Sequence, residues 1–152
     1  MSEVLAPVAG LVRPLRDVPD PVFAAEMVGA GIAIEPAGGV SDAVAPVAGT
    51  VLKLHPHAFV VLTPQGTGVL VHLGIDTVRL AGAGFEVLVQ EKSSVRAGQP
   101  VTRWSPADVA GRGLSPMVIL CVLDTVAGAV TSARTGETVA AGDALFVWPA
   151  PA

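Results

Sequence analysis

The sequence is poor in charged residues and in cysteine, and each scarcity excludes a class of protein. Charged residues make up 14% of the 152 residues and the formal net charge is −4, so no basic surface is available to neutralise nucleic-acid phosphates. The single cysteine, Cys121, excludes an internal disulfide and fits a reducing compartment. Because Cys121 lies in an apolar run, residues 117–123, we expect it to be a buried strand residue.

Long hydrophobic runs are also absent. No run approaches the ~20 apolar residues that a membrane-spanning helix needs, and the first ten residues have neither a basic leader nor a long apolar core. We therefore expect a cytoplasmic protein without direct membrane insertion. Residues 149–152 have the composition of a frayed end rather than a linker, so residues 1–152 are expected to form a single domain without a fused membrane part.

Turn-forming residues are abundant instead. The 17 glycines and 13 prolines are spread between short apolar runs, which is typical of turns joining short strands. Residues 6–10 and 45–49 both read APVAG, and a second similar pair occupies residues 95–101 and 139–145. These patterns predict an all-β fold, an internally duplicated antiparallel β-sandwich or barrel.

Helix is expected only as short turns. Residues 20–28 and residues 106–111 can each form a turn or two, and Ser105 before Pro106 is a suitable N-cap for the second.

All three histidines of the chain lie between residues 54 and 80. Residues 57–62 and 68–73 are strand-like, and the segment between them carries strong turn signals, which indicates an antiparallel hairpin. If the turn centres on Pro64 and Gln65, His57 faces His72 directly across the hairpin. A shift of register by one or two residues would leave a diagonal contact or move one ring to the other face.

Two imidazoles among aliphatic neighbours cannot both be comfortably protonated, so a neutral, nucleophilic ring is favoured. Such a ring can attack a phosphoryl group while the other ring donates a hydrogen bond to its oxygens. Asp76 follows His72 by four residues, beyond a turn at Gly74. It can cap nearby backbone amides, recognise a partner protein, or do both. His55 can be an auxiliary residue of the site or simply flank Pro56 on the surface.

The same residues resemble the glucose-type IIA family of the phosphoenolpyruvate-dependent sugar phosphotransferase system, over nearly the whole chain. The matching blocks are residues 18–23 with 27–34, residues 45–50, and residues 57–59 with 71–78. The resemblance implies a phosphohistidine cycle without a cofactor. His72 would accept phosphate from the phosphocarrier protein HPr and pass it to a cysteine of a IIB domain, and His57 would orient the phosphoryl group. The membrane IIC or IIBC permease would be reached through IIB.

The resemblance also implies a surface for docking partner proteins. Its apolar residues would be Val22, Phe23, Met27, Val28 and Val78, and its acidic residues, Asp20 and Asp76, would meet a basic carrier. Ordinary core packing of a short helical turn is the alternative for residues 22–28. His55 stands where the family often has a threonine, and Leu70 stands where an aromatic residue is frequent.

Two other classes of protein are disfavoured. A zinc enzyme would use the HxH motif at residues 55–57 and the HxxxD motif at residues 72–76, but β-sheet metallopeptidases carry these motifs in the reverse order and far apart. We therefore expect no metal, although His57 and His72 could be opportunistic zinc ligands. A biotin or lipoyl carrier needs a lysine at a hairpin tip, and neither Lys53 nor Lys92 has the expected methionine neighbours.

Overall fold

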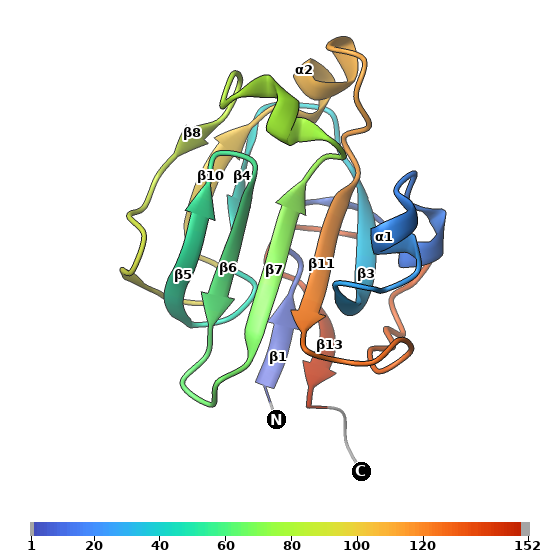
Figure 1. Cartoon of the computed structure of the whole chain (residues 1–152), viewed down its shortest axis with the longest axis vertical. Helices are drawn as coiled ribbons and strands as arrows, with labels where there is room; N and C mark the ends of the chain where they lie inside the picture. Colours follow the sequence, from blue (N-terminus) through green and yellow to red (C-terminus); the bar gives the residue numbers. More distant parts are fainter. Residues whose placement is uncertain (1, 150–152) are drawn as a thin grey trace.

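The computed structural model describes residues 2–149 and consists mainly of antiparallel strands (Figure 1). An eight-stranded sheet curls around the core, in the order β12 (Thr138–Val139), β2 (Gly10–Pro14), β3 (Gly29–Pro36), β11 (Val118–Leu123), β7 (Gly68–Leu73), β6 (Ala58–Leu62), β5 (Gly49–His55), β9 (Ser94–Val95). A three-stranded sheet has the order β4 (Ser41–Val44), β10 (Pro100–Trp104), β8 (Glu86–Val87), and β1 (Ser2–Leu5) pairs with β13 (Ala144–Trp148). The predicted all-β class is confirmed.

The internal duplication is visible in the backbone hydrogen bonds of the two APVAG segments. The segments pair with each other, because Leu5 N–H donates to Pro46 C=O and Val44 N–H donates to Pro7 C=O. Each APVAG segment also accepts a backbone hydrogen bond from one of the two later repeats, residues 95–101 and 139–145. Gly142 N–H donates to the carbonyl of Ala6, and Gly98 N–H donates to the equivalent carbonyl of Ala45. The two halves of the sequence thus contact each other through the APVAG segments and make equivalent backbone hydrogen bonds there.

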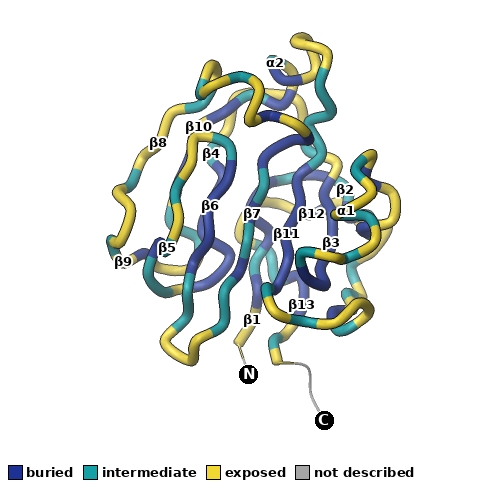
Figure 2. The backbone as a smooth tube through the Cα atoms, viewed as in Figure 1, coloured by how far each residue is buried: buried dark blue, intermediate teal, exposed yellow. Residues whose placement is uncertain are grey.

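The main core lies inside the curled sheet. Along β7 the residues alternate, so that Val69, Val71 and Leu73 are buried in this core while Leu70 and His72 face the other side. Figure 2 shows the middle strands of the sheet as largely buried, whereas β5 alternates between half-buried and exposed residues. Trp104 and Phe59 are the largest fully buried side chains.

A second, smaller core covers the outer face of the sheet. Leu15 and Val18 pack there against Ala33 of β3 and against Ile119 and Cys121 of β11. This packing holds the segment from η1 (Leu15–Asp17) to α1 (Pro21–Ala24) against the sheet, over β3 and next to β11 (Figure 1). Cys121 is a buried strand residue, as predicted, and burial raises the pKa of its thiol to about 12.

The short helices differ in how well the sequence predicted them. Helix α2 (Pro106–Gly111) has the predicted bounds, and the hydroxyl of its N-cap Ser105 accepts from Asp108 N–H at 3.1 Å. Helix α1 is shorter than the predicted 20–28, because Glu26 adopts a left-handed φ of 56° that ends the helical path. No helix among residues 2–149 is long and apolar enough to cross a membrane. The frayed end expected at 149–152 falls, from residue 150 on, outside the described residues.

Candidate active site

His72 lies on the outer face of β7, next to Ile119 of β11. Its Nδ1 is 2.6 Å from the carbonyl oxygen of Gly74, two residues further along the chain. A carbonyl oxygen only accepts hydrogen bonds, so Nδ1 of the neutral ring carries the proton and donates it. The lone pair of the neutral imidazole is therefore on Nε2, which makes Nε2 the nucleophilic atom.

The turn that supplies this carbonyl is fixed by its backbone conformation. Gly74 has a φ of 84°, and a Cβ atom at this position would lie 2.5 Å from Cγ2 of Thr77. Thr77 is only 1% exposed, and its hydroxyl donates to the carbonyl of Leu73 at 2.8 Å. Thr77 was missed by the sequence analysis, because its role depends on a contact that the motif does not reveal. What reveals its role is structural: Thr77 is a polar residue buried at the start of η2 (Thr77–Leu80).

The predicted hairpin is present, but the predicted register is wrong by one residue. Ala58, not His57, pairs with His72, and the closing pair of the turn is Leu62 with Gly68. His57 lies in the two-residue turn between β5 and β6 instead of on a strand. Its carbonyl accepts from Leu73 N–H at 2.8 Å, which keeps the turn beside the end of β7.

The two imidazoles nevertheless meet. The ring centroids of His57 and His72 are 5.1 Å apart with an interplanar angle of 74°, an edge-to-face contact. His55, at the end of β5, adds a third ring, stacked on His57 with centroids 5.8 Å apart and planes 28° apart. On the other side, the ring of Phe23 is 5.3 Å from that of His72. The site is thus a row of four rings, His55, His57, His72 and Phe23.

This arrangement keeps the two central histidines neutral. Burial, followed by the neighbouring His72 and His55, lowers the pKa of His57 to about 4. Burial also lowers the pKa of His72, against the opposing effects of the Gly74 carbonyl, Asp20 and Asp76. Near neutral pH the site therefore contains two uncharged imidazoles side by side, as expected for two such rings in apolar surroundings.

Three of the docking residues expected from the sequence, Phe23, Asp20 and Asp76, lie close enough to His72 to act on its ring. The carboxylate of Asp20 caps α1 by accepting from the N–H groups of Val22 at 2.9 Å and of Phe23 at 3.2 Å, which holds Phe23 against His72. Three apolar side chains near the site are exposed: Val22 at 47%, Met27 at 74% and Val78 at 65%. Val28 is half-buried.

Asp76 is exposed beside the site and has a left-handed φ of 60° at the start of η2. Its side chain makes no capping hydrogen bond to that helix, so the amide-capping alternative is not supported. The carboxylate lies 4.0 Å from the guanidinium of Arg79 in an exposed ion pair, which leaves it accessible to a partner.

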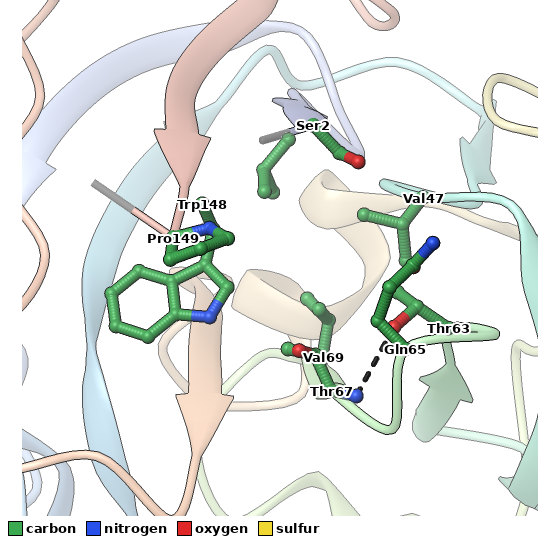
Figure 3. Close-up of a pocket in the computed structure, with 9 residues that line it drawn as sticks. Ser2, Val47, Thr63, Gln65, Thr67, Val69, Trp148 and Pro149 are labelled. Atoms are coloured by element: carbon green, nitrogen blue, oxygen red, sulfur yellow. Dashed lines mark hydrogen bonds between the residues drawn. The ribbon is translucent and has the colours of Figure 1, made fainter. Parts of the chain in front are cut away.

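No group of three or more His, Cys, Asp or Glu side chains within residues 2–149 is arranged to hold a metal ion. A separate cavity of about 180 Å³ lies at the other end of the β6–β7 hairpin (Figure 3). It is lined by turn residues such as Thr63 and Thr67 and by Trp148, and none of the histidines reaches it.

Comparisons with known proteins agree with this fold. Residues 2–128 match the family described as phosphoenolpyruvate-dependent sugar phosphotransferase system, EIIA 1. The glucose-specific EIIA component of Bacillus anthracis is 34% identical over 141 residues, which cover 91% of this chain and 84% of that protein. The structure of glucose permease IIA from Mycoplasma capricolum is similar with a TM-score of 0.79 and 35% identity, covering 95% of this chain and 93% of that one.

A longer relative places the same unit inside a multidomain protein. The glucose-specific EIIBCA component of Corynebacterium glutamicum is 40% identical over 124 residues, which are 78% of this chain but 18% of that protein. The chain thus spans less than a fifth of this relative. The chain belongs to the EIIA 1 family of the sugar phosphotransferase system. It is accordingly a phosphotransferase component, a phosphoryl carrier of that system.

Proposed function

We propose that the protein accepts phosphate from the phosphocarrier protein HPr on Nε2 of His72 and passes it to a cysteine of a IIB domain. The observation that carries this proposal is the 2.6 Å hydrogen bond from Nδ1 of His72 to the carbonyl of Gly74. That bond fixes the tautomer and aims the lone pair of Nε2 at an incoming phosphorus atom. The whole chain, residues 1–152, is proposed to act as one IIA domain.

The two transfers are simple displacements at phosphorus. In the first, the bond from phosphorus to the nitrogen of a donor phosphohistidine breaks while a bond to Nε2 of His72 forms. In the second, the bond to Nε2 breaks while a bond to the sulfur of a cysteine thiolate forms. The proton stays on Nδ1 throughout, hydrogen-bonded to the Gly74 carbonyl, so His72 returns to its starting tautomer.

His57 is proposed to steady the phosphoryl group without carrying it. The centroid of its ring lies 5.1 Å from that of His72. An imidazole N–H at this distance can donate to an oxygen of a phosphoryl group whose phosphorus is bound to Nε2. Because the pKa of His57 is near 4, the ring is uncharged before phosphate arrives. The incoming negative charge then makes it easier for this ring to bind a proton.

The exposed apolar side chains around His72 are proposed to form the docking surface for both partners. Val22, Met27 and Val78 would exclude water from the phosphoryl group during transfer, while a small contact area would allow quick release. Asp20 and Asp76 would attract a basic carrier. The name of the longer relative joins EIIB and EIIC to EIIA, which supports a IIB partner for this chain.

The proposed cycle lies in the cytoplasm, since phosphoenolpyruvate, its phosphate source, is a cytoplasmic metabolite. Through IIB and the membrane IIC component, the phosphate would reach a sugar as it is taken up. No nucleic acid takes part in this cycle.

The test is phosphorylation with phosphoenolpyruvate, the general first enzyme of the system and HPr. The protein is expected to become an acid-labile, base-stable phosphoprotein, and the phosphate is expected to map to the peptide that contains His72. The His72→Gln variant should gain no phosphate, whereas the matched His57→Gln variant should still accept it. Phosphorylation of His72→Gln at the wild-type rate would overturn the proposal.

A further inference from the structure

The two histidines of the proposed transfer pair are held in different ways. The His72 ring is fixed by its hydrogen bond to the Gly74 carbonyl. The His57 ring makes no hydrogen bond to any of residues 2–149, although its backbone carbonyl is bound by Leu73 N–H. The backbone of His57 is therefore fixed by a hydrogen bond, whereas its ring is in contact with two other rings, those of His72 and His55.

His55 stands on a rigid part of the sheet. It is the last residue of β5 and pairs with Ala58, directly across the Pro56-His57 turn. The exposed edge of β5 before it is braced by two side chains: Glu91 accepts from Leu54 N–H at 3.0 Å, and Lys92 donates to the carbonyl of Leu52 at 3.0 Å. These bonds keep the outer end of the strand in place, so the ring of His55 has a firm base.

The contact between His55 and His57 has the geometry of a stacked pair. Centroids 5.8 Å apart and planes 28° apart fall within the range in which aromatic rings attract each other. His55 covers one side of the His57 ring, and His72 meets it at an angle of 74° on another. A ring held from two directions has little freedom to rotate about its χ2 torsion, which is otherwise broad for histidine.

We propose that His55 is a positioning residue, whose stacked ring holds His57 in the orientation that steadies the phosphoryl group on His72. The proposal rests on the function proposed above and adds a residue to it. His55 does not touch the phosphoryl group; it removes rotational freedom from the group that does. Small errors in the orientation of a catalytic group cost large factors in rate, so the effect of His55 belongs to the transfer step.

The experiment compares His55→Ala, which removes the ring, with His55→Phe, which keeps a stacking ring without nitrogen donors. His55 is exposed, so replacing its side chain with Ala or Phe should leave the fold intact. Onward transfer from the phosphorylated protein to IIB is followed by rapid quenching over a range of IIB concentrations. We expect the maximal rate of His55→Ala to fall about tenfold with an unchanged KM. His55→Phe should stay within about twofold of wild type.

Acceptance of phosphate by His72 should be the same in both variants, because the anchor of His72 at Gly74 is untouched. An equal loss in His55→Phe and His55→Ala would overturn the proposal, since a nitrogen of His55 would then be required. A raised KM with an unchanged maximal rate would also overturn it, because His55 would then be a partner contact. Wild-type behaviour of His55→Ala would overturn it outright.

A second measurement does not depend on the proposed function. The ring resonances of His57 in unphosphorylated protein should shift in His55→Ala and remain near their wild-type positions in His55→Phe. Unchanged resonances in His55→Ala would refute the orienting contact even if transfer were impaired. Wild-type protein that takes no phosphate from HPr would instead refute the proposed function. The resonances would still test whether the His55 ring orients the His57 ring.

Discussion

His72 and His57 stand 5.1 Å apart, yet the structure supports them by opposite means. His72 is on a central strand, and the carbonyl oxygen of Gly74, two residues further along the chain, accepts a hydrogen bond from its Nδ1. His57 is in the turn between β5 and β6, and its side chain packs against other rings without a hydrogen bond to any of the described residues. Burial lowers the pKa of both, but only His72 has groups that pull its pKa back up.

The difference suits the two tasks proposed for these residues. A residue that forms and breaks a bond to phosphorus benefits from one fixed tautomer and one fixed direction for its lone pair. A residue that stabilises the group in transit must fit it as it arrives from one partner and leaves for another. A ring held by stacking keeps its orientation, and it leaves both ring nitrogens free of hydrogen bonds to the described residues, so that one of them can donate to the phosphoryl group.

The largest expected effect separates these tasks by removing the second ring. In His57→Gln, acceptance of phosphate on His72 should continue, because the anchor at Gly74 is intact, while onward transfer to IIB should fall about a hundredfold. Single-turnover measurements of each half-reaction provide the check. Equal loss in both half-reactions, or none in either, would show that the two rings do not divide the work.

The next effect concerns the anchor of His72. Gly74→Ala places a Cβ atom 2.5 Å from Cγ2 of Thr77 and requires a φ of 84° from a residue that disfavours it. We expect a loss of about 2–3 kcal/mol in the free energy of unfolding and slower acceptance of phosphate. Urea unfolding measures the first effect. Gly66→Ala, which has a similar φ of 89° but open space around it, is the matched control and should lose less.

A smaller effect should follow from loosening Phe23, the ring at the end of the row, whose aromatic contact is with His72. Asp20→Ala removes the cap of α1, whereas Asp20→Asn keeps a capping oxygen and removes only the charge. We expect Asp20→Ala to lose about 1 kcal/mol of stability and Asp20→Asn much less. Both should bind HPr more weakly at low salt. If the two variants lose stability equally, the charge and not the cap matters at this position.

The smallest effect is a dependence of stability on pH. The pKa of His57 is about 4 in the folded protein and about 6.5 when unfolded, so between these values the unfolded chain binds more protons. Stability should therefore fall as pH drops from 7 toward 4, by no more than about 1 kcal/mol because solvent screens this half-exposed ring. Urea unfolding of wild type and His57→Gln at about pH 7.5 and pH 5 measures it, and the variant should show the weaker dependence.

Much of the fold followed from local sequence signals. Glycine and proline spacing predicted short strands, and Ser105 before Pro106 marked the start of α2, because caps and turns depend on nearby residues. The register of the β6–β7 hairpin was missed by one residue. The five residues from Thr63 to Thr67 close on Leu62 and Gly68, a choice among similar turns that packing decides and that local pattern does not.

The sequence by itself determined that the histidines would be near each other, because one short turn joins the segments that carry them. Tertiary structure alone decided how each is used. The outer core under Leu15 and Val18 carries α1 across the sheet and brings Phe23 to His72 from nearly fifty residues away. The two-residue turn at His57 brings His55 onto the same row of rings. Long-range packing sets these contacts, since spacing along a chain limits which side chains can meet but does not fix their orientation.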